Sequence, residues 1–137
     1  MAKNISARVC RQLEKVARAA AKKSYSPYSE FPVGAAVLAA SGKIYAGCNV
    51  ENASYGLCNC AERTAIFTAA AAGERRILAV AVFTPTAQPT SPCGACRQVM
   101  AEFGNFRILS ATLSGEVFES TVDNLLPRSH TGILDLD

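Results

Sequence analysis

The clearest chemical signal in this 137-residue chain comes from three cysteines and a glutamate. Cys60 stands two residues before Glu62, and Cys93 and Cys96 follow later in a Cys-x-x-Cys pattern. Three thiolates can hold a tetrahedral zinc ion and leave its fourth position to water, an arrangement typical of catalytic rather than structural zinc. Water bound to zinc ionises with a pKa of about 7, against about 15.7 in bulk, and a nearby carboxylate can move its protons. The pattern therefore predicts a hydrolase with one zinc ion per chain.

The residues around these cysteines predict that both cysteine segments enter helices. Cys93 and Cys96 are one helical turn apart, so their sulfurs share a face, and Cys60 arrives from a neighbouring helix start. Helix N-termini favour thiolate over thiol, which a metal ligand requires. The competing interpretation, that the cysteines are small buried apolar residues, explains one cysteine better than it explains this paired pattern. The same layout is typical of nucleobase deaminases.

Cys58 leaves a second kind of zinc site open. As a fourth thiolate it would close the coordination sphere and give a structural site in which Glu62 has no chemical role. Glu62 would then only favour the first turn of its helix. Arg63 is predicted to hydrogen-bond cysteine sulfurs and offset the net negative charge of three thiolates and Zn²⁺, with a solvent-facing side chain as the alternative.

Length and composition favour one soluble domain, residues 1–137, with half of the residues apolar and thus enough for a core. The sequence has no apolar run of about 18 residues and no apolar signal core at its start, so we expect no membrane span and a cytoplasmic location. Six cysteines in that setting favour metal binding over disulfides. The net charge of +3 is too mild for a nucleic-acid binder and favours a small-molecule substrate.

Apolar periodicity and turn residues outline the elements that must position the cysteines. We expect helices at 4–23, 60–72, 92–103 and 122–126, and strands at 33–40, 43–50, 77–84, 106–113 and 116–120. The order α-β-β-α-β-α-β-β-α predicts an α/β fold, a three-layer α/β/α sandwich around one five-stranded mixed sheet. An irregular connection, 51–59, and a polar loop, 85–91, lead into the two cysteine-bearing helices.

Four stretches of the chain resemble the small, homotetrameric cytidine deaminases. They are residues 25–36 (YSPYSEFPVGAA), 47–55 (GCNVENASY), 58–65 (CNCAERTA) and 91–98 (SPCGACRQ). The resemblance runs from roughly residue 12 to Pro127, nearly the whole chain. It implies a cytidine deaminase-like fold, a homotetramer, and zinc-dependent hydrolysis of cytidine and 2′-deoxycytidine to uridine and 2′-deoxyuridine with release of ammonia, as in pyrimidine salvage.

The resemblance also implies how the reaction is divided among residues. Cys60, Cys93 and Cys96 would hold the zinc ion. Glu62 would take a proton from zinc-bound water, the resulting hydroxide would attack C4 of the cytosine ring, and Glu62 would pass protons to N3 and to the departing amino group.

Substrate binding is implied for a further set of positions. Asn49 and Glu51 would bind the ribose hydroxyls, and their i, i+2 spacing independently places both side chains on one face of an extended strand. A solvated polar strand end is the alternative for this pair. Phe31 would pack against the base or sugar. Backbone groups of Ala61 and Ser91 would contact the exocyclic amine and the carbonyl.

Two residues are implied to act across subunits. Tyr55 resembles a residue that reaches into a neighbouring subunit's site. Three residues after Pro127 the family usually has a phenylalanine that stacks over a neighbour's substrate, but this chain has His130. Histidine can stack and also donate a hydrogen bond, so nucleoside binding is compatible with a changed preference. Residues 128–137 could equally be a mobile tail.

Other functions stay open from the sequence. A deaminase of a modified cytidine or another aminopyrimidine nucleoside would keep the same site, because Asn49 and Glu51 constrain the sugar more than the base. A non-catalytic, zinc-stapled binding domain would use Cys58 and be indifferent to Glu62. An editor of cytosines in RNA or DNA would need basic grooves that this chain does not offer.

Overall fold

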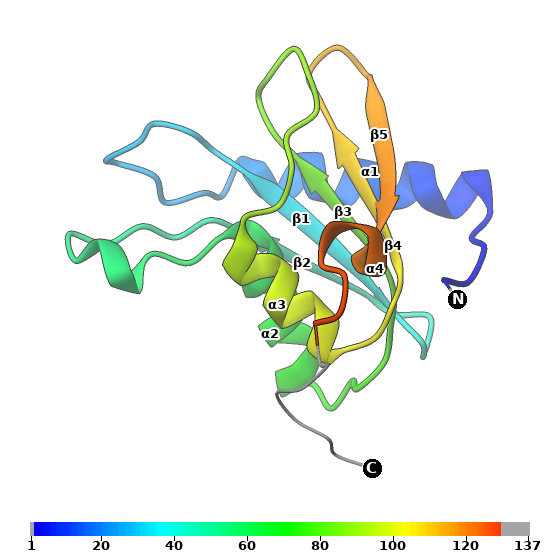
Figure 1. Ribbon diagram of the computed structural model, residues 1–137. Coiled ribbons are helices and arrows are strands. Elements are labelled where there is room, and N and C mark those ends of the chain that lie inside the picture. Colours follow the sequence, from blue (N-terminus) through cyan, green and yellow to red (C-terminus); the bar gives the residue numbers. More distant parts are fainter. Residues whose placement is uncertain (1, 130–137) are drawn as a thin grey trace.

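The computed structural model describes residues 2–129, in which helices and strands alternate along the chain (Figure 1). In chain order they are α1 (Ala7–Ala21), β1 (Gly34–Ala39), β2 (Ile44–Cys48), the 3-10 helix η1 (Tyr55–Leu57), α2 (Ala61–Ala71), β3 (Ile77–Phe83), α3 (Gly94–Glu102), β4 (Arg107–Ala111), β5 (Val117–Thr121) and α4 (Val122–Leu125). The predicted order of helices and strands is confirmed, with η1 added between β2 and α2. No helix in residues 2–129 is long and apolar enough to span a bilayer.

The five strands form one mixed sheet, as predicted, and their order in it is β2-β1-β3-β4-β5. Strand β1 is antiparallel to both β2 and β3, and β5 is antiparallel to β4. Strands β3 and β4 run parallel. Because parallel neighbours need a crossover connection, the chain leaves the sheet after β3 and returns through α3. That crossover places the second cysteine segment directly after the end of β3.

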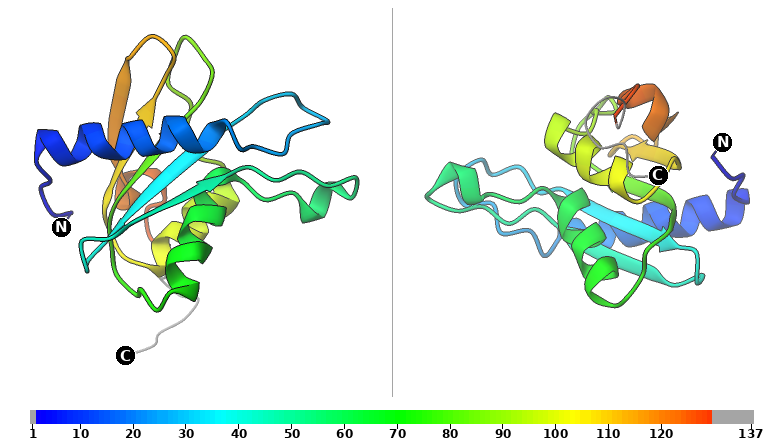
Figure 2. Two further views of the ribbon diagram at one scale, coloured as in Figure 1. Left: turned by 180° about the vertical axis from the view of Figure 1, so that it is seen from behind. Right: turned by 60° about the horizontal axis from the view of Figure 1, so that its bottom comes forward.

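Helix α1 covers one face of the sheet (Figure 2). It is shorter than the predicted 4–23 because the Ser6 hydroxyl caps its N-terminus. Its buried residues recur at three- and four-residue spacing and are Cys10, Leu13, Ala17 and Ala21. They pack on strand residues of the same face, including Ala36, Leu38, Ala81 and Leu109. The approach is close at Gly34, where a Cβ would lie 1.9 Å from the Ala17 carbonyl oxygen.

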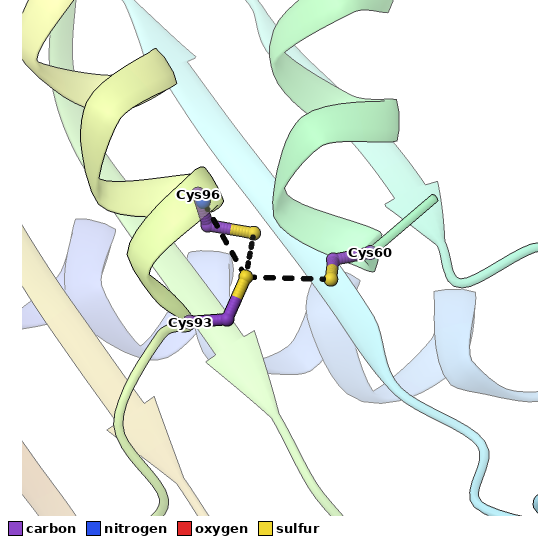
Figure 3. A group of neighbouring side chains, drawn as sticks. All are labelled: Cys60, Cys93 and Cys96. Atoms are coloured by element: carbon purple, nitrogen blue, oxygen red, sulfur yellow. Dashed lines mark hydrogen bonds between the residues drawn. The ribbon is translucent and has the colours of Figure 1, made fainter. Parts of the chain in front are cut away.

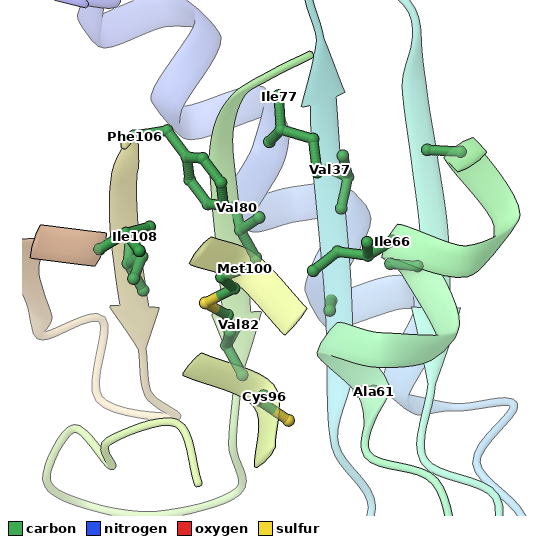
Figure 4. Close-up of a cluster of buried hydrophobic side chains, with 14 of the residues drawn as sticks. Val37, Ala61, Ile66, Ile77, Val80, Val82, Cys96, Met100, Phe106 and Ile108 are labelled. Atoms are coloured by element: carbon green, nitrogen blue, oxygen red, sulfur yellow. The ribbon is translucent and has the colours of Figure 1, made fainter. Parts of the chain in front are cut away.

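Helices α2, α3 and α4 cover the other face, which completes the three-layer sandwich (Figures 1 and 2). The core of this side joins Ile66 of α2 and Met100 of α3 to sheet residues such as Val80 (Figure 4). Helix α2 packs so tightly on β2 that a Cβ at Gly47 would lie 2.4 Å from the Ala65 backbone nitrogen. The helix that carries Glu62 is therefore fixed against the sheet by backbone contact.

The two cysteine-bearing helices begin later than predicted. Cys60 and Cys93 have extended backbone, with ψ of 155° and 164°, and both act as N-caps rather than as helical residues. Pro92, predicted in the first turn of its helix, therefore lies just before α3. This correction matters for the site, because a capping position lies at the mouth of a helix rather than on its side.

Candidate active site

A pocket forms where β1 begins and where β2 and β3 end. The strand register pairs Gly34, the first residue of β1, with the last residues of both β2 and β3. The pocket has a volume of about 470 Å³, within the range of roughly 300–1,000 Å³ typical of small-molecule sites. Its lining residues are Ser29, Phe31, Val33, Asn49, Glu51, Cys60, Ala61, Glu62, Val82, Thr84, Thr90, Ser91, Pro92 and Cys93.

The sulfurs of Cys60, Cys93 and Cys96 meet at the starts of α2 and α3 (Figure 3). The Cys60 and Cys93 sulfurs lie 3.7 Å apart. The Cys96 sulfur lies 3.3 Å from that of Cys93, and the Cys96 N–H donates to the Cys93 sulfur over 3.4 Å. All three sulfurs are within 4.8 Å of one another. The structure thus brings the three predicted metal ligands together.

The chemistry and spacing of this group fit zinc. Ligands held tetrahedrally at about 2.3 Å from zinc lie roughly 3.8 Å apart, close to the two sulfur separations of 3.3 and 3.7 Å. Hydrogen bonds from Cys96, and then from Arg63 and Cys93, lower the pKa of Cys60 to about 5 despite its burial. The hydrogen bond to Cys60 and burial raise the pKa of Cys96, so a bound cation is what would favour thiolates throughout the group.

Cys58 does not belong to the sulfur cluster. Its sulfur lies 3.3 Å from the Asn52 backbone nitrogen and 3.5 Å from the Asn52 carbonyl oxygen. Among residues 2–129, the metal-binding group that the structure forms consists of Cys60, Cys93 and Cys96. This geometry favours the three-thiolate site with a position left for water over the closed four-thiolate alternative.

Arg63 lies beside the cluster. Its Nη2 donates to the Cys60 sulfur over 3.2 Å, and this hydrogen bond raises the pKa of the guanidinium. Its Nε atom is buried and has no hydrogen-bond partner in the part of the chain that the structure describes. The side chain therefore faces the thiolates rather than solvent, where its charge offsets part of theirs.

Glu62 provides a buried carboxyl group next to the sulfurs. It lies in the first turn of α2, lines the pocket and is only 5% exposed. Burial raises its pKa, and the charge on Cys60 adds to the effect. A buried carboxyl group with a raised pKa holds a proton more readily than an exposed carboxylate, which suits a group that accepts a proton and then donates it.

Phe31, Asn49 and Glu51 line the same pocket. Asn49 and Glu51 flank Val50, whose backbone forms β-bridges with Tyr25 and with Asn59. This stretch is therefore extended, as expected. Phe31 is 37% exposed and its ring is therefore accessible to a ligand. The structure brings these three residues to one cavity with the cysteines and Glu62.

Of the remaining predicted positions, some line the pocket and others do not. Ala61, fully buried at the start of α2, and Ser91, just before α3, both line the pocket. Tyr55 lies in η1, is 77% exposed and does not line the pocket of its own chain. Its ring stands edge-on to that of Tyr28, with the two ring centroids 6.5 Å apart. His130 lies outside the described residues.

Sequence reasoning missed the role of Arg97 in shaping the pocket. Its guanidinium donates to the Pro92 carbonyl oxygen over 2.8 Å, to the Leu125 carbonyl oxygen over 2.9 Å and to the Ser91 hydroxyl over 2.6 Å. It thus ties the entrance of α3 to the end of α4. No acidic residue stands three or four positions from Arg97 on its helix, so the sequence offers no ion pair for it and does not indicate these partners.

Comparison with known proteins agrees with this site. Residues 8–112 match the model of the family described as the cytidine and deoxycytidylate deaminase zinc-binding region. The chain is 54% identical over 110 residues to a cytidine deaminase of Sporosarcina psychrophila, spanning 79% of this chain and 81% of the relative. It is 51% identical over 110 residues to a cytidine deaminase of Halalkalibacterium halodurans, spanning 79% and 83%.

Solved structures show the same likeness. The crystal structure of cytidine deaminase from Burkholderia pseudomallei superposes with a TM-score of 0.83 at 49% identity, covering 90% of this chain and 98% of that one. For the cytidine deaminase from Mycobacterium leprae the TM-score is 0.74 at 41% identity, with coverage of 86% and 97%. The likeness therefore extends over almost the full length of both neighbours.

Proposed function

The chain belongs to the cytidine and deoxycytidylate deaminase family, and on that premise we propose that it hydrolyses cytidine and 2′-deoxycytidine to uridine and 2′-deoxyuridine with release of ammonia. The observation that carries this proposal is the buried carboxyl group of Glu62 next to the three-sulfur cluster, in a pocket of about 470 Å³. A purely structural zinc site has no need of a buried carboxyl group that opens onto a cavity.

Cys60, Cys93 and Cys96 would hold zinc, which supplies a Lewis acid that makes water nucleophilic toward C4 of the ring at neutral pH. Glu62 takes the proton that the attacking water loses. It then delivers protons to N3 of the pyrimidine and to the departing amino group. Its raised pKa suits a group that must hold a proton between these two steps.

The pocket lining supports an unphosphorylated nucleoside as substrate. Among the described residues, 2–129, the lining contains the carboxyl groups of Glu51 and Glu62 and no lysine or arginine. A phosphate would be repelled there, which argues against both nucleotides and the backbone of RNA or DNA. Asn49 and Glu51 bind the sugar, and Phe31 packs against the base or sugar. Backbone groups of Ala61 and Ser91 contact the exocyclic amine and the carbonyl.

We extend the proposal to a homotetramer. The loops before β1 and after β2 project together from the sheet (Figures 1 and 2). These two segments carry large apolar side chains that are exposed. They are Tyr25, Tyr28, Tyr55 and Leu57, each more than half exposed. Exposed apolar groups gathered in one region favour association. In such an assembly Tyr55 reaches the pocket of a neighbouring subunit, as the family resemblance implies.

One alternative gives way to this function and another remains compatible with it. The four-thiolate binding domain is disfavoured because Cys58 bonds to Asn52 rather than joining the cluster. A preference for a modified cytidine stays compatible, since the sugar contacts do not constrain substituents on the base. A cytoplasmic location and a role in pyrimidine salvage stay predictions.

The test is to incubate the purified protein with cytidine, 2′-deoxycytidine and cytidine 5′-monophosphate and to follow ammonia release, with zinc measured on the same sample. We expect one zinc per chain, turnover of both nucleosides and little turnover of the nucleotide. Zinc at that level with no turnover of either nucleoside would overturn the proposed substrates. Preferred turnover of the nucleotide would overturn the argument from the pocket's charge.

A further inference from the structure

The loop formed by residues 24–33 is held by the segment that carries the sugar-binding pair. The Tyr25 N–H donates to the Asn49 carbonyl oxygen over 3.1 Å, and the Glu51 N–H donates to the Tyr25 carbonyl oxygen over 2.8 Å. At the other end of the loop, the Asn49 N–H donates to the Val33 carbonyl oxygen over 3.2 Å. Backbone hydrogen bonds therefore attach both ends of the loop to residues 49–51, and side-chain hydrogen bonds hold its middle.

The Glu51 carboxylate is the first of these contacts. Its Oε1 accepts hydrogen bonds from the Tyr28 N–H at 3.0 Å and the Ser29 N–H at 3.1 Å. Its Oε2 accepts from the Ser29 hydroxyl at 2.5 Å. The Ser29 hydroxyl is also the main cause of the lowered pKa of Glu51. A carboxylate offers about four acceptor sites, so this loop uses most of them and leaves room for one further donor.

The Asn49 amide is engaged in the same way. Its Oδ1 accepts from the Ser24 hydroxyl at 2.5 Å and from the Val33 N–H at 2.9 Å. Its Nδ2 donates to the Phe31 carbonyl oxygen at 2.8 Å. An amide has two donors and two acceptor sites, so one N–H is left. The loop therefore fixes both side chains, and each keeps one hydrogen-bonding position for a ligand in the pocket that they line.

We propose that Ser29 and Ser24 are positioning residues for sugar recognition: their hydroxyls hold the Glu51 carboxylate and the Asn49 amide so that the one free acceptor and the one free donor face the sugar of the substrate. This inference rests on the proposed function, in which Asn49 and Glu51 bind the sugar. It assigns to the two serines an effect on substrate binding that they exert through their partners.

Ser29 has the larger expected effect. Its hydroxyl oxygen also accepts from the Phe31 N–H at 3.1 Å, so it couples Glu51 to the backbone of the residue that packs on the ligand. The next residue, Glu30, has a φ of 54°, in the left-handed region that only a fixed local structure maintains in a non-glycine residue. Removing the Ser29 hydroxyl releases Oε2 of Glu51, so the carboxylate can turn about Oε1, which stays bonded to the Tyr28 and Ser29 N–H groups. The backbone bonds at both ends keep the loop attached.

The experiment compares the zinc-loaded wild type with Ser29→Ala, Ser29→Thr and Ser26→Ala, each assayed with cytidine and with 2′,3′-dideoxycytidine. Ser29→Thr keeps the hydroxyl. Ser26→Ala is the matched control, because the Ser26 hydroxyl lies in the same loop and bonds to Ser24 but not to Glu51 or Asn49. Circular dichroism establishes that each variant is folded before its kinetics are measured.

We expect Ser29→Ala to raise KM for cytidine about tenfold, as the loss of a hydrogen bond to a charged group predicts, with kcat changed little. Its KM for 2′,3′-dideoxycytidine should equal that of the wild type, because that substrate lacks the 2′ and 3′ hydroxyls, which are the sugar hydroxyls that Glu51 would bind. Ser29→Thr and Ser26→Ala should behave as the wild type with both substrates.

Two results would overturn the inference, and they separate it from the proposed function. In the first, the wild type binds cytidine better than 2′,3′-dideoxycytidine, but Ser29→Ala raises KM equally for both substrates or for neither. Ser29 then does not position Glu51 for the sugar, whereas the sugar contacts of Asn49 and Glu51 stand. If the wild type binds both substrates equally well, Asn49 and Glu51 do not bind the 2′ and 3′ hydroxyls, and the inference fails together with the sugar contacts assigned under the proposed function. Deamination of cytidine itself is untouched by either result.

Discussion

The Arg63 guanidinium donates a hydrogen bond to the Cys60 sulfur over 3.2 Å, three residues along the same helix start. This contact places a cation beside a cluster whose three thiolates exceed the charge of Zn²⁺ by one. It also helps to lower the pKa of Cys60 to about 5, after the larger effect of Cys96. The helix that presents the ligand therefore also presents the charge that stabilises the ligand as a thiolate.

Arg63→Gln should make zinc binding more sensitive to acid. The Arg63 cation keeps Cys60 deprotonated, and so able to bind zinc, down to a pH near its lowered pKa. Removing the cation raises the pKa of Cys60, and protons then displace zinc at a higher pH. We expect the midpoint of zinc release in a pH titration with a chromophoric chelator to rise by on the order of one pH unit. Arg63→Lys keeps the charge and should shift less. An unchanged midpoint in Arg63→Gln would show that Arg63 does not stabilise the ligand.

Replacing a cysteine of the cluster should remove zinc, whereas replacing Cys58 should not. We expect Cys93→Ser and Cys96→Ser to lose both bound zinc and turnover, because two thiolates hold zinc poorly against a chelator. Cys58→Ser should keep one zinc per chain and near wild-type turnover, since its sulfur bonds to Asn52. Metal analysis after dialysis measures this. Zinc loss in Cys58→Ser would revive the four-thiolate site.

Gly47→Ala should destabilise the protein by forcing α2 away from β2. A Cβ at this position would lie 2.4 Å from the Ala65 backbone nitrogen, which cannot move without the helix. We expect a loss of about 1–3 kcal/mol or more in the free energy of unfolding, measured by urea denaturation. Gly94→Ala is the control, because a Cβ there meets no heavy atom within 4 Å. Equal stability of the two variants would mean that the sheet and α2 are not fixed by this contact.

Arg97→Met should loosen the entrance of α3. The side chain makes three hydrogen bonds, to Ser91, Pro92 and Leu125, and losing them leaves two carbonyl groups without this donor. We expect a loss of stability of about 1–3 kcal/mol together with a raised KM, because Ser91 and Pro92 line the pocket. The exposed neighbour Gln98, changed to methionine, should show neither effect. An unchanged KM in Arg97→Met would confine its role to folding.

The elements of the fold were largely predictable because they depend on local patterns. The spacing of Val9, Leu13 and Val16 predicts α1, although the residues it buries are Cys10, Leu13, Ala17 and Ala21. The order of helices and strands follows from such patterns along the chain. The helix starts at Cys60 and Cys93 were misjudged by one or two residues, because both cysteines are extended N-cap residues, and composition does not reveal this. Only the Cys93 sulfur accepts a capping hydrogen bond. The order of the strands in the sheet was not predicted, since it depends on pairing between distant segments.

The candidate site divides in the same way. The cysteines, Glu62 and the Asn49–Glu51 pair have motif spacing, and the structure brings them to one pocket. Ser24, Ser29 and Arg97 have no such spacing, because each has a partner that lies 22 to 28 residues away in sequence. Only the folded chain places a serine hydroxyl on a carboxylate across such a separation. Their roles therefore had to be read from hydrogen bonds rather than from sequence.

The most direct test of the account is Glu62→Gln, with zinc content and cytidine deamination measured on the same preparation. Glutamine keeps the size and most of the contacts of the buried side chain but cannot carry a proton between the water and the base. We predict one zinc per chain, as in the wild type, and a loss of turnover of at least about a hundredfold. Turnover close to that of the wild type with zinc bound would contradict the central claim that Glu62 moves the protons of this reaction.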